Sequence, residues 1–139
     1  MNIDTRKWFD RSQPQTLQIA TWLLYLNAFF QILDFFDVLR FSGYGITDIL
    51  NPGRSGLMFL FLGIPLNVLA GLLMANDRKL GYYLAIAGAF WPFVTRFYYN
   101  DFSFNAIFHA KAITLIFEIA LCALVLHTQS RDHQRVWFR

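Results

Sequence analysis

The chain has 139 residues, of which 56% are hydrophobic, 19% are aromatic and only 15% are charged. Soluble domains are usually about a quarter charged, so this composition favours a chain whose solvent is lipid. The net charge of +3 does not indicate a nucleic-acid partner, because the basic residues lie at the ends of apolar segments rather than along one face. The length leaves room for one domain.

Four segments are apolar over the roughly 20 residues that a membrane-spanning helix needs. In chain order they cover about 16–39, 56–74, 80–99 and 105–127. The second, third and fourth segments are joined by loops of a few residues, which requires neighbouring helices to run antiparallel. The sequence therefore predicts an all-α fold: an integral membrane, four-helix antiparallel bundle with short loops, forming a single polytopic domain over 1–139.

Lysine and arginine are distributed unevenly between the two ends of these segments. One end carries Arg6, Lys7, Arg11, Arg78, Lys79, Arg131, Arg135 and Arg139, whereas the other carries Arg40 and Arg54. Because cytoplasmic loops are enriched in Lys and Arg, both termini are expected in the cytoplasm. The expected location is a bacterial-type plasma membrane, with the lipid bilayer as a partner and bound lipid in contact with the chain.

Small residues line one side of the second and third segments. Helices in lipid pack closely where small side chains allow their backbones to approach. The second segment has small residues at seven-residue spacing, and the third has a similar stripe, so these two helices are expected to pack together through Gly56, Gly63, Ala70, Gly81, Ala85 and Gly88.

Polar and charged residues interrupt the predicted spans. Asn27, Gln31 and Asp34 share one face of the first helix, because their spacing is i, i+4, i+7, and Asp37 continues that face. A charge at the centre of a bilayer costs about 2.5–3.5 kcal/mol on insertion scales, so such residues are usually paired or functional. The full predicted network is Asn27, Gln31, Asp34, Asp37, Asn67, Arg96, Lys111 and Glu118.

The rise per residue along each helix predicts which members of this network meet. Asp34, Arg96 and Lys111 are expected at one depth, so Asp34 is expected to pair with Arg96 or Lys111. Glu118 is expected nearer the middle, where Asn27, Asn67 or Lys111 are its candidate partners. Three roles follow for the network, in order of preference: ion pairing that fixes the bundle, a hydrated solute site, and a proton relay through Asp34 and Glu118.

The sequence carries no catalytic or metal-binding signature. Cys122 is the single cysteine, and no P-loop, GxSxG, GxGxxG or HExxH motif occurs. His109 and His127 are too far apart on one helix to hold one metal or haem. No cofactor, metal or catalytic residue is predicted, and an enzymatic role is not favoured.

Three functional hypotheses remain open at this point. The first is a non-catalytic accessory or structural subunit of a larger membrane complex, assembling with other membrane subunits or with itself. The alternative is a small solute, ion or proton transporter or channel, acting as a homo-oligomer with a polar site between helices. The third is an accessory of a quinone-linked membrane oxidoreductase.

Overall fold

The computed structural model describes residues 4–41, 57–99, 104–105 and 112–138. The regular elements in these ranges are helices and include no β-strand, which confirms the all-α prediction for the described part of the chain. The helices are α1 (Gln15–Phe41), α2 (Leu57–Ala75), α3 (Lys79–Tyr99), α4 (Ala112–Leu126) and α5 (Thr128–Trp137).

The described residues form five helices where the sequence predicted four. The fourth segment was expected to end near residue 127, and α4 ends at Leu126; the helix that the sequence did not predict is α5, which follows after a bend of 49°. His127 caps the new helix, because its Nδ1 accepts a hydrogen bond from the Gln129 N–H at 3.2 Å. At the bend, the Tyr82 hydroxyl donates to the Val125 carbonyl at 2.8 Å. The tail is thus a separate polar helix rather than an irregular end.

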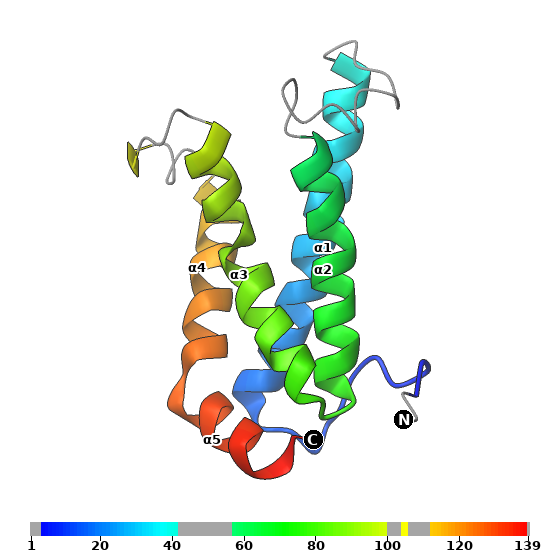
Figure 1. Ribbon diagram of the computed structural model, residues 1–139, viewed down its shortest axis with the longest axis vertical. Helices are drawn as coiled ribbons and strands as arrows, with labels where there is room; N and C mark the ends of the chain where they lie inside the picture. Colours follow the sequence, from blue (N-terminus) through cyan, green and yellow to red (C-terminus); the bar gives the residue numbers. More distant parts are fainter. Residues whose placement is uncertain (1–3, 42–56, 100–103, 106–111, 139) are drawn as a thin grey trace.

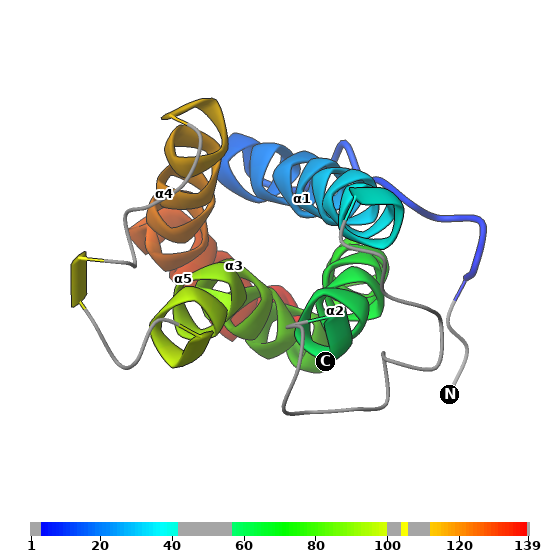
Figure 2. The same ribbon diagram turned by 90° about the horizontal axis from the view of Figure 1, so that it is seen from above.

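Helices α1 to α4 lie around a ring, in which α1 packs against α2 and α4, and α3 packs against the same two helices (Figure 2). Helix α5 crosses one end of this ring, close to the first turns of α1 (Figure 1). The N-terminal segment and the short turn between α2 and α3 lie at the same end. This end is called the base below, and it comprises residues 4–13, residues 76–78 and α5.

Helices α2 and α3 approach each other closely at the base. A Cβ atom added at Gly81 would meet the backbone nitrogen of Met74, and it would lie 2.5 Å from the carbonyl carbon of Leu73. Ala70 and Ala85 are fully buried. Farther from the base, Gly63 and Gly88 leave space for polar side chains of the interior, and Gly56 lies outside the described residues. The small side chains therefore set the distance between α2 and α3.

The apolar core occupies the half of the molecule nearest the base. It is formed by the first turns of α1 and α3 and the last turns of α2 and α4, with Leu17, Leu24, Met74, Leu121 and Val125 among its fully buried members. Large apolar side chains also cover the outside of the ring. Exposed examples are Ile19, Trp22, Phe29, Leu33, Phe36, Phe61, Leu69, Phe90, Val94, Ile113, Ile116 and Ile119.

Among the described residues, one helix is by itself long and apolar enough to cross a membrane. It is the 23-residue stretch Gln15–Asp37 within α1. Helices α4 and α5 pass the same test only when they are counted as one bent span, and Phe61–Ala75 is a shorter apolar helix. Tyrosine, tryptophan and proline interrupt the apolar residues of α3. Length and composition thus support one or two of the four predicted spans.

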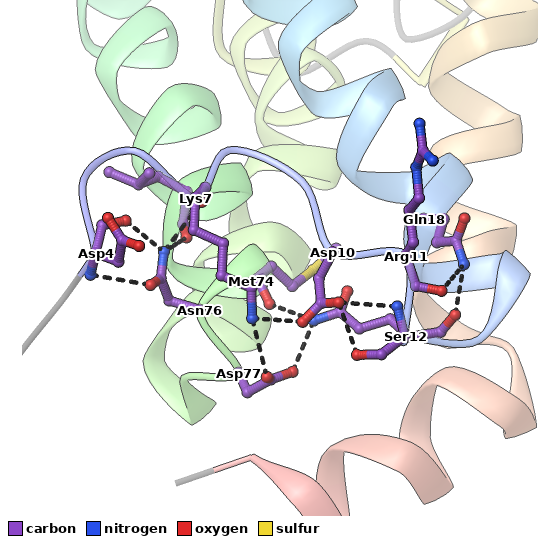
Figure 3. Close-up of polar contacts among 11 residues, drawn as sticks. Asp4, Lys7, Asp10, Arg11, Ser12, Gln18, Met74, Asn76 and Asp77 are labelled. Atoms are coloured by element: carbon purple, nitrogen blue, oxygen red, sulfur yellow. Dashed lines mark hydrogen bonds and ion pairs between the residues drawn. The ribbon is translucent and has the colours of Figure 1, made fainter.

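The N-terminal segment 4–13, called the strap below, is held against the α2–α3 turn (Figure 3). The Asn76 amide nitrogen donates to the carbonyls of Leu72, Lys7 and Asp4 at 2.9, 3.1 and 3.2 Å, and its oxygen accepts from the Asp4 N–H at 3.1 Å. The Gln13 amide donates to the Met74 carbonyl at 2.7 Å. Every donor and acceptor on the Asn76 amide thus has a partner.

Asp77 combines an unusual backbone conformation with contacts to the strap. Its φ of 54° lies in the left-handed region, where it ends α2 with a hydrogen bond from the Arg78 N–H to the Leu73 carbonyl. Its carboxylate accepts from the Gln13 amide at 2.8 Å and lies 3.6 Å from the Lys7 ammonium. A glycine would adopt this backbone conformation more readily. The contacts of the Asp77 side chain with the strap offset this conformational cost.

Lys7 and Asp10 form an ion pair within the strap, with 2.5 Å between Nζ and Oδ2. Burial alone would raise the pKa of Asp10, but hydrogen bonds from Lys7 and Ser12 outweigh it and lower the pKa from 3.8 to about 2. The hydrogen bond to Asp10 also raises the pKa of Lys7 above its ordinary 10.5. The pair therefore stays ionised across the neutral range.

Candidate functional site

Beyond the apolar core, the interior of the ring becomes polar. Asn27 and Gln31 are one turn apart on α1 and point inward, Asn67 is fully buried on α2, and Glu118 is buried on α4. Each of the four side chains is less than a tenth exposed. Three helices thus place amides and a carboxylate where a packed bundle normally has aliphatic side chains.

Arg96 of α3 and Glu118 of α4 form an ion pair, in which an Arg96 Nη donates to Glu118 Oε1. The Glu118 side chain is 3% exposed and the Arg96 side chain 18%. The guanidinium also lies over the Phe93 ring, 5.7 Å from its centroid. The sequence predicted other partners for Glu118, because Arg96 was placed nearer the outer surface, but the arginine side chain reaches the carboxylate.

A cavity of about 140 Å³ lies beside this ion pair, between α1, α3 and α4. Seven of its ten lining residues are polar or charged, and two are aromatic. The lining residues are Asn27, Phe30, Gln31, Asp34, Trp91, Pro92, Thr95, Arg96, Thr114 and Glu118. Five of the eight residues of the predicted network are therefore brought together at one cavity.

The remaining members of the predicted network lie elsewhere. Asn67 is buried next to the cavity, where its amide donates to the Gly63 carbonyl at 2.9 Å and to Gln31 Oε1 at 3.4 Å. Asp37 is exposed on α1 and is not part of the lining. Lys111 lies outside the described residues.

Two buried polar atoms at the cavity have no hydrogen-bond partner among the described residues: Asn27 Nδ2 and Glu118 Oε2. The same is true of Asn67 Oδ1, which packs close to Gly88. A buried polar atom without a partner costs about 1–3 kcal/mol, and native proteins contain few of them. Both atoms at the cavity have almost no accessible surface, so they are unsatisfied groups of the packed interior beside it and lower the stability there.

Sequence reasoning did not identify the walls of the cavity. Phe30, Trp91, Pro92 and Thr95 carry no pattern that separates them from other residues of a span. Thr114 lies one turn before Glu118 on the same helical face, so helical spacing is the signal that could have found it. The Thr95 hydroxyl donates its hydrogen to the Pro92 carbonyl at 2.9 Å, so at the cavity its oxygen can act only as a hydrogen-bond acceptor.

No family model, curated protein or solved structure matches the chain. Within the described ranges, no group of three or more His, Cys, Asp or Glu side chains is placed to hold a metal ion.

Proposed function

We propose that the protein is an integral membrane bundle that binds a small polar solute between α1, α3 and α4 and carries it across the bilayer. In this proposal α1 to α4 are the four antiparallel spans, and α5 lies at the membrane surface. The observation that carries the proposal is the cavity of about 140 Å³ between α1, α3 and α4, because seven of its ten lining residues are polar or charged.

The distribution of side chains supports a membrane location. Polar groups such as Thr21, Asn67 and Glu118 are buried, whereas phenylalanine, leucine and isoleucine cover the outside of the helices. A soluble bundle covers its outer face mainly with polar and charged side chains, so the apolar outer surface is the feature that favours lipid here. Helices in lipid gain little from burying apolar groups, so they associate through small and polar residues instead.

The charge at the base supports the expected orientation. Arg11, Arg131 and Arg135 are exposed there, and the exposed Lys79 follows the turn 76–78 directly. Basic residues next to spans favour the cytoplasmic side of the membrane. The base is accordingly assigned to the cytoplasm, with both termini on that side.

The same cavity argues against a purely structural ion pair. Taking two charges out of water is costly, and a pair that only fixes a bundle is stabilised best when its remaining lone pairs are hydrogen-bonded. Glu118 Oε2 has no such bond among the described residues. One water needs only roughly 10–15 Å³ of such volume, so a cavity of about 140 Å³ has space for several waters or one small solute.

Osmotic swelling of proteoliposomes tests this function. Vesicles with the purified protein are mixed with a panel of small polar solutes, and light scattering follows their entry. At least one solute should enter faster than into protein-free vesicles, and Glu118→Gln should slow it. If the protein accelerates none of the panel, the transport proposal fails.

An accessory-subunit role is the second candidate. It is favoured by exposed aromatic rings on three helices, among them Phe29, Phe61 and Phe90, which suit contact with the helices of a neighbouring subunit. Purification in a gentle detergent followed by mass spectrometry separates the two. Stoichiometric recovery with different membrane subunits supports the accessory role, and recovery of this chain alone counts against it.

A further inference from the structure

We infer that Gly63 of α2 limits the size of the solute that the cavity accepts. The inference rests on the proposed function and adds the residue that determines this limit. The sequence predicted Gly63 as a contact between α2 and α3, but the space beside its α-carbon is occupied by one side chain from α1 and one from α3. Gly63 is not among the residues that line the cavity, so it acts through these two side chains as a positioning residue.

The space beside Gly63 is filled by Gln31 and Trp91. A Cβ atom added at Gly63 would lie 2.5 Å from Gln31 Oε1, and it would lie 2.8 and 2.9 Å from Cδ1 and Nε1 of the Trp91 indole. Non-bonded carbon atoms pack at about 3.5–4.0 Å, so these separations cannot persist without a shift. A side chain at position 63 therefore requires Gln31 and Trp91 to move.

The direction of this movement follows from the arrangement of the helices. Helices α2 and α4 lie on opposite sides of the ring, with α1 and α3 between them (Figure 2). Gln31 and Trp91 line the cavity from α1 and α3, whereas no residue of α2 lines it in the described part of the chain. The two side chains thus form the wall of the cavity nearest to α2. A side chain at position 63 would displace this wall away from α2 and into the cavity.

Asn67, one turn after Gly63 on α2, restricts the movement of Gln31 in the other direction. Asn67 is fully buried, and its amide donates to the Gly63 carbonyl at 2.9 Å and to Gln31 Oε1 at 3.4 Å. Packed groups therefore adjoin the Gln31 amide on the side of α2. The cavity of about 140 Å³ is the free volume next to Gln31 and Trp91, so the displaced side chains should reduce it.

Gly71, about two turns farther along α2, provides a matched control. A Cβ atom at Gly71 would lie 2.5 Å from Cε1 of Tyr25, the same shortest separation as at Gly63. Tyr25 does not line the cavity, and its hydroxyl donates to the Trp8 carbonyl of the strap at 2.8 Å. Gly63→Ala and Gly71→Ala therefore add the same methyl group to the same helix, and they differ in whether the obstructed side chain belongs to the cavity wall.

Proteoliposome swelling tests the inference with a panel that includes ethylene glycol, glycerol and erythritol, uncharged solutes of increasing size. The size ratio is the entry rate of the largest solute that the parent accelerates, divided by the rate of the smallest, after subtraction of the rates in protein-free vesicles. In Gly63→Ala this ratio should fall on the order of tenfold, because the larger solute meets an overpacked wall. In Gly71→Ala it should equal the parental ratio.

Trp91→Phe tests the same wall without a change at Gly63. The smaller ring should enlarge the cavity and raise the size ratio, so this variant decides the question even if Gly63→Ala does not fold. A ratio that does not rise in Trp91→Phe would overturn the inference.

Three further outcomes would contradict the role of Gly63. A parental size ratio in Gly63→Ala would overturn the inference and leave the proposed transport intact. An equal fall of the ratio in Gly63→Ala and Gly71→Ala would also overturn it, because it would reflect a general disturbance of α2. If the parent accelerates no solute of the panel, the proposed function itself fails, and the inference fails with it.

Discussion

The base and the cavity differ in how several of their polar side chains are hydrogen-bonded. At the base, the Asn76 amide uses its oxygen and both of its N–H groups, and Tyr82 and Gln13 each donate to a helix-end carbonyl. At the cavity, Asn27 and Glu118 are less than a tenth exposed, as Tyr82 and Gln13 are, yet each has an atom without a partner among the described residues.

This difference separates structural from functional polarity. Hydrogen bonds at the base close turns and attach the strap, so they contribute to the stability of the fold. The atoms at the cavity lower that stability, and a site that binds a ligand is where such a loss is expected. Substitutions at the base should therefore change the stability of the fold alone, whereas substitutions at the cavity should also change solute uptake.

Removing one partner of the buried ion pair should have the largest effect. Glu118→Ala leaves the Arg96 charge without its carboxylate and is expected to lower the free energy of unfolding by about 3–5 kcal/mol. Circular dichroism during thermal unfolding in detergent micelles measures the loss. The double variant Arg96→Met with Glu118→Leu should recover most of it. If the double variant is as unstable as the single one, the charges are not what holds α3 to α4 at this point.

Enlarging Gly81 should be the next most damaging change. A leucine at this position would collide with the backbone of α2 and push α2 and α3 apart, with a loss of about 1–3 kcal/mol. Ala87→Leu is the matched control, because Ala87 is exposed on the same helix and its enlargement meets no helix backbone. The same unfolding assay compares them, and equal stability of the two variants would contradict the close approach of α2 and α3.

Truncating Asn76 should have a smaller effect, localised to the strap. Asn76→Ala removes the amide that joins Leu72, Lys7 and Asp4, with an expected loss of roughly 1 kcal/mol. Hydrogen exchange should increase in residues 4–13 and remain unchanged in α4. Solute uptake should also remain at the parental level, because the base is separate from the cavity. A change spread evenly over all helices would mean that the strap and the bundle unfold as one unit.

The smallest effect is expected from pH, again at the strap. Because the pKa of Asp10 is lowered from 3.8 to about 2, its contribution is complete above about pH 3.8 and is lost as the pH falls toward 2. Lys7 has a raised pKa, so its contribution is complete below pH 10.5 and is lost at higher pH. Fluorescence of a dye attached to the strap should thus report loosening in acid and in strong alkali. Asp10→Asn should remove the acid transition, and its persistence would assign the transition to another group.

The helices were largely predictable from the sequence, and the reasons are local. Apolar runs of sufficient length predicted α1, α2 and α3 to within two residues at each end. Helix α5 was not predicted, since its residues are mostly polar and its inward face consists of Ser130 and Gln134. Helix α5 therefore has no apolar periodicity from which it could have been predicted.

The cavity was predictable only in part. The face shared by Asn27, Gln31 and Asp34 follows from helical spacing, and all three line the cavity. The partner of Glu118 did not follow, because counting the rise per residue places α-carbons and ignores the reach of the Arg96 side chain. That Asn27 and Glu118 each lack one hydrogen bond is a property of the packed interior, and no sequence pattern records it.

The Arg96–Glu118 pair also affects how the helices enter the membrane during synthesis. Its two members lie on consecutive helices, so during synthesis α3 is complete before Glu118 is added. In the proposed membrane, each charge is costly to insert alone, whereas together they enter as a neutral pair. Helices α3 and α4 should therefore leave the translocon as one hairpin, and the interval between their synthesis becomes a constraint on the order of membrane insertion.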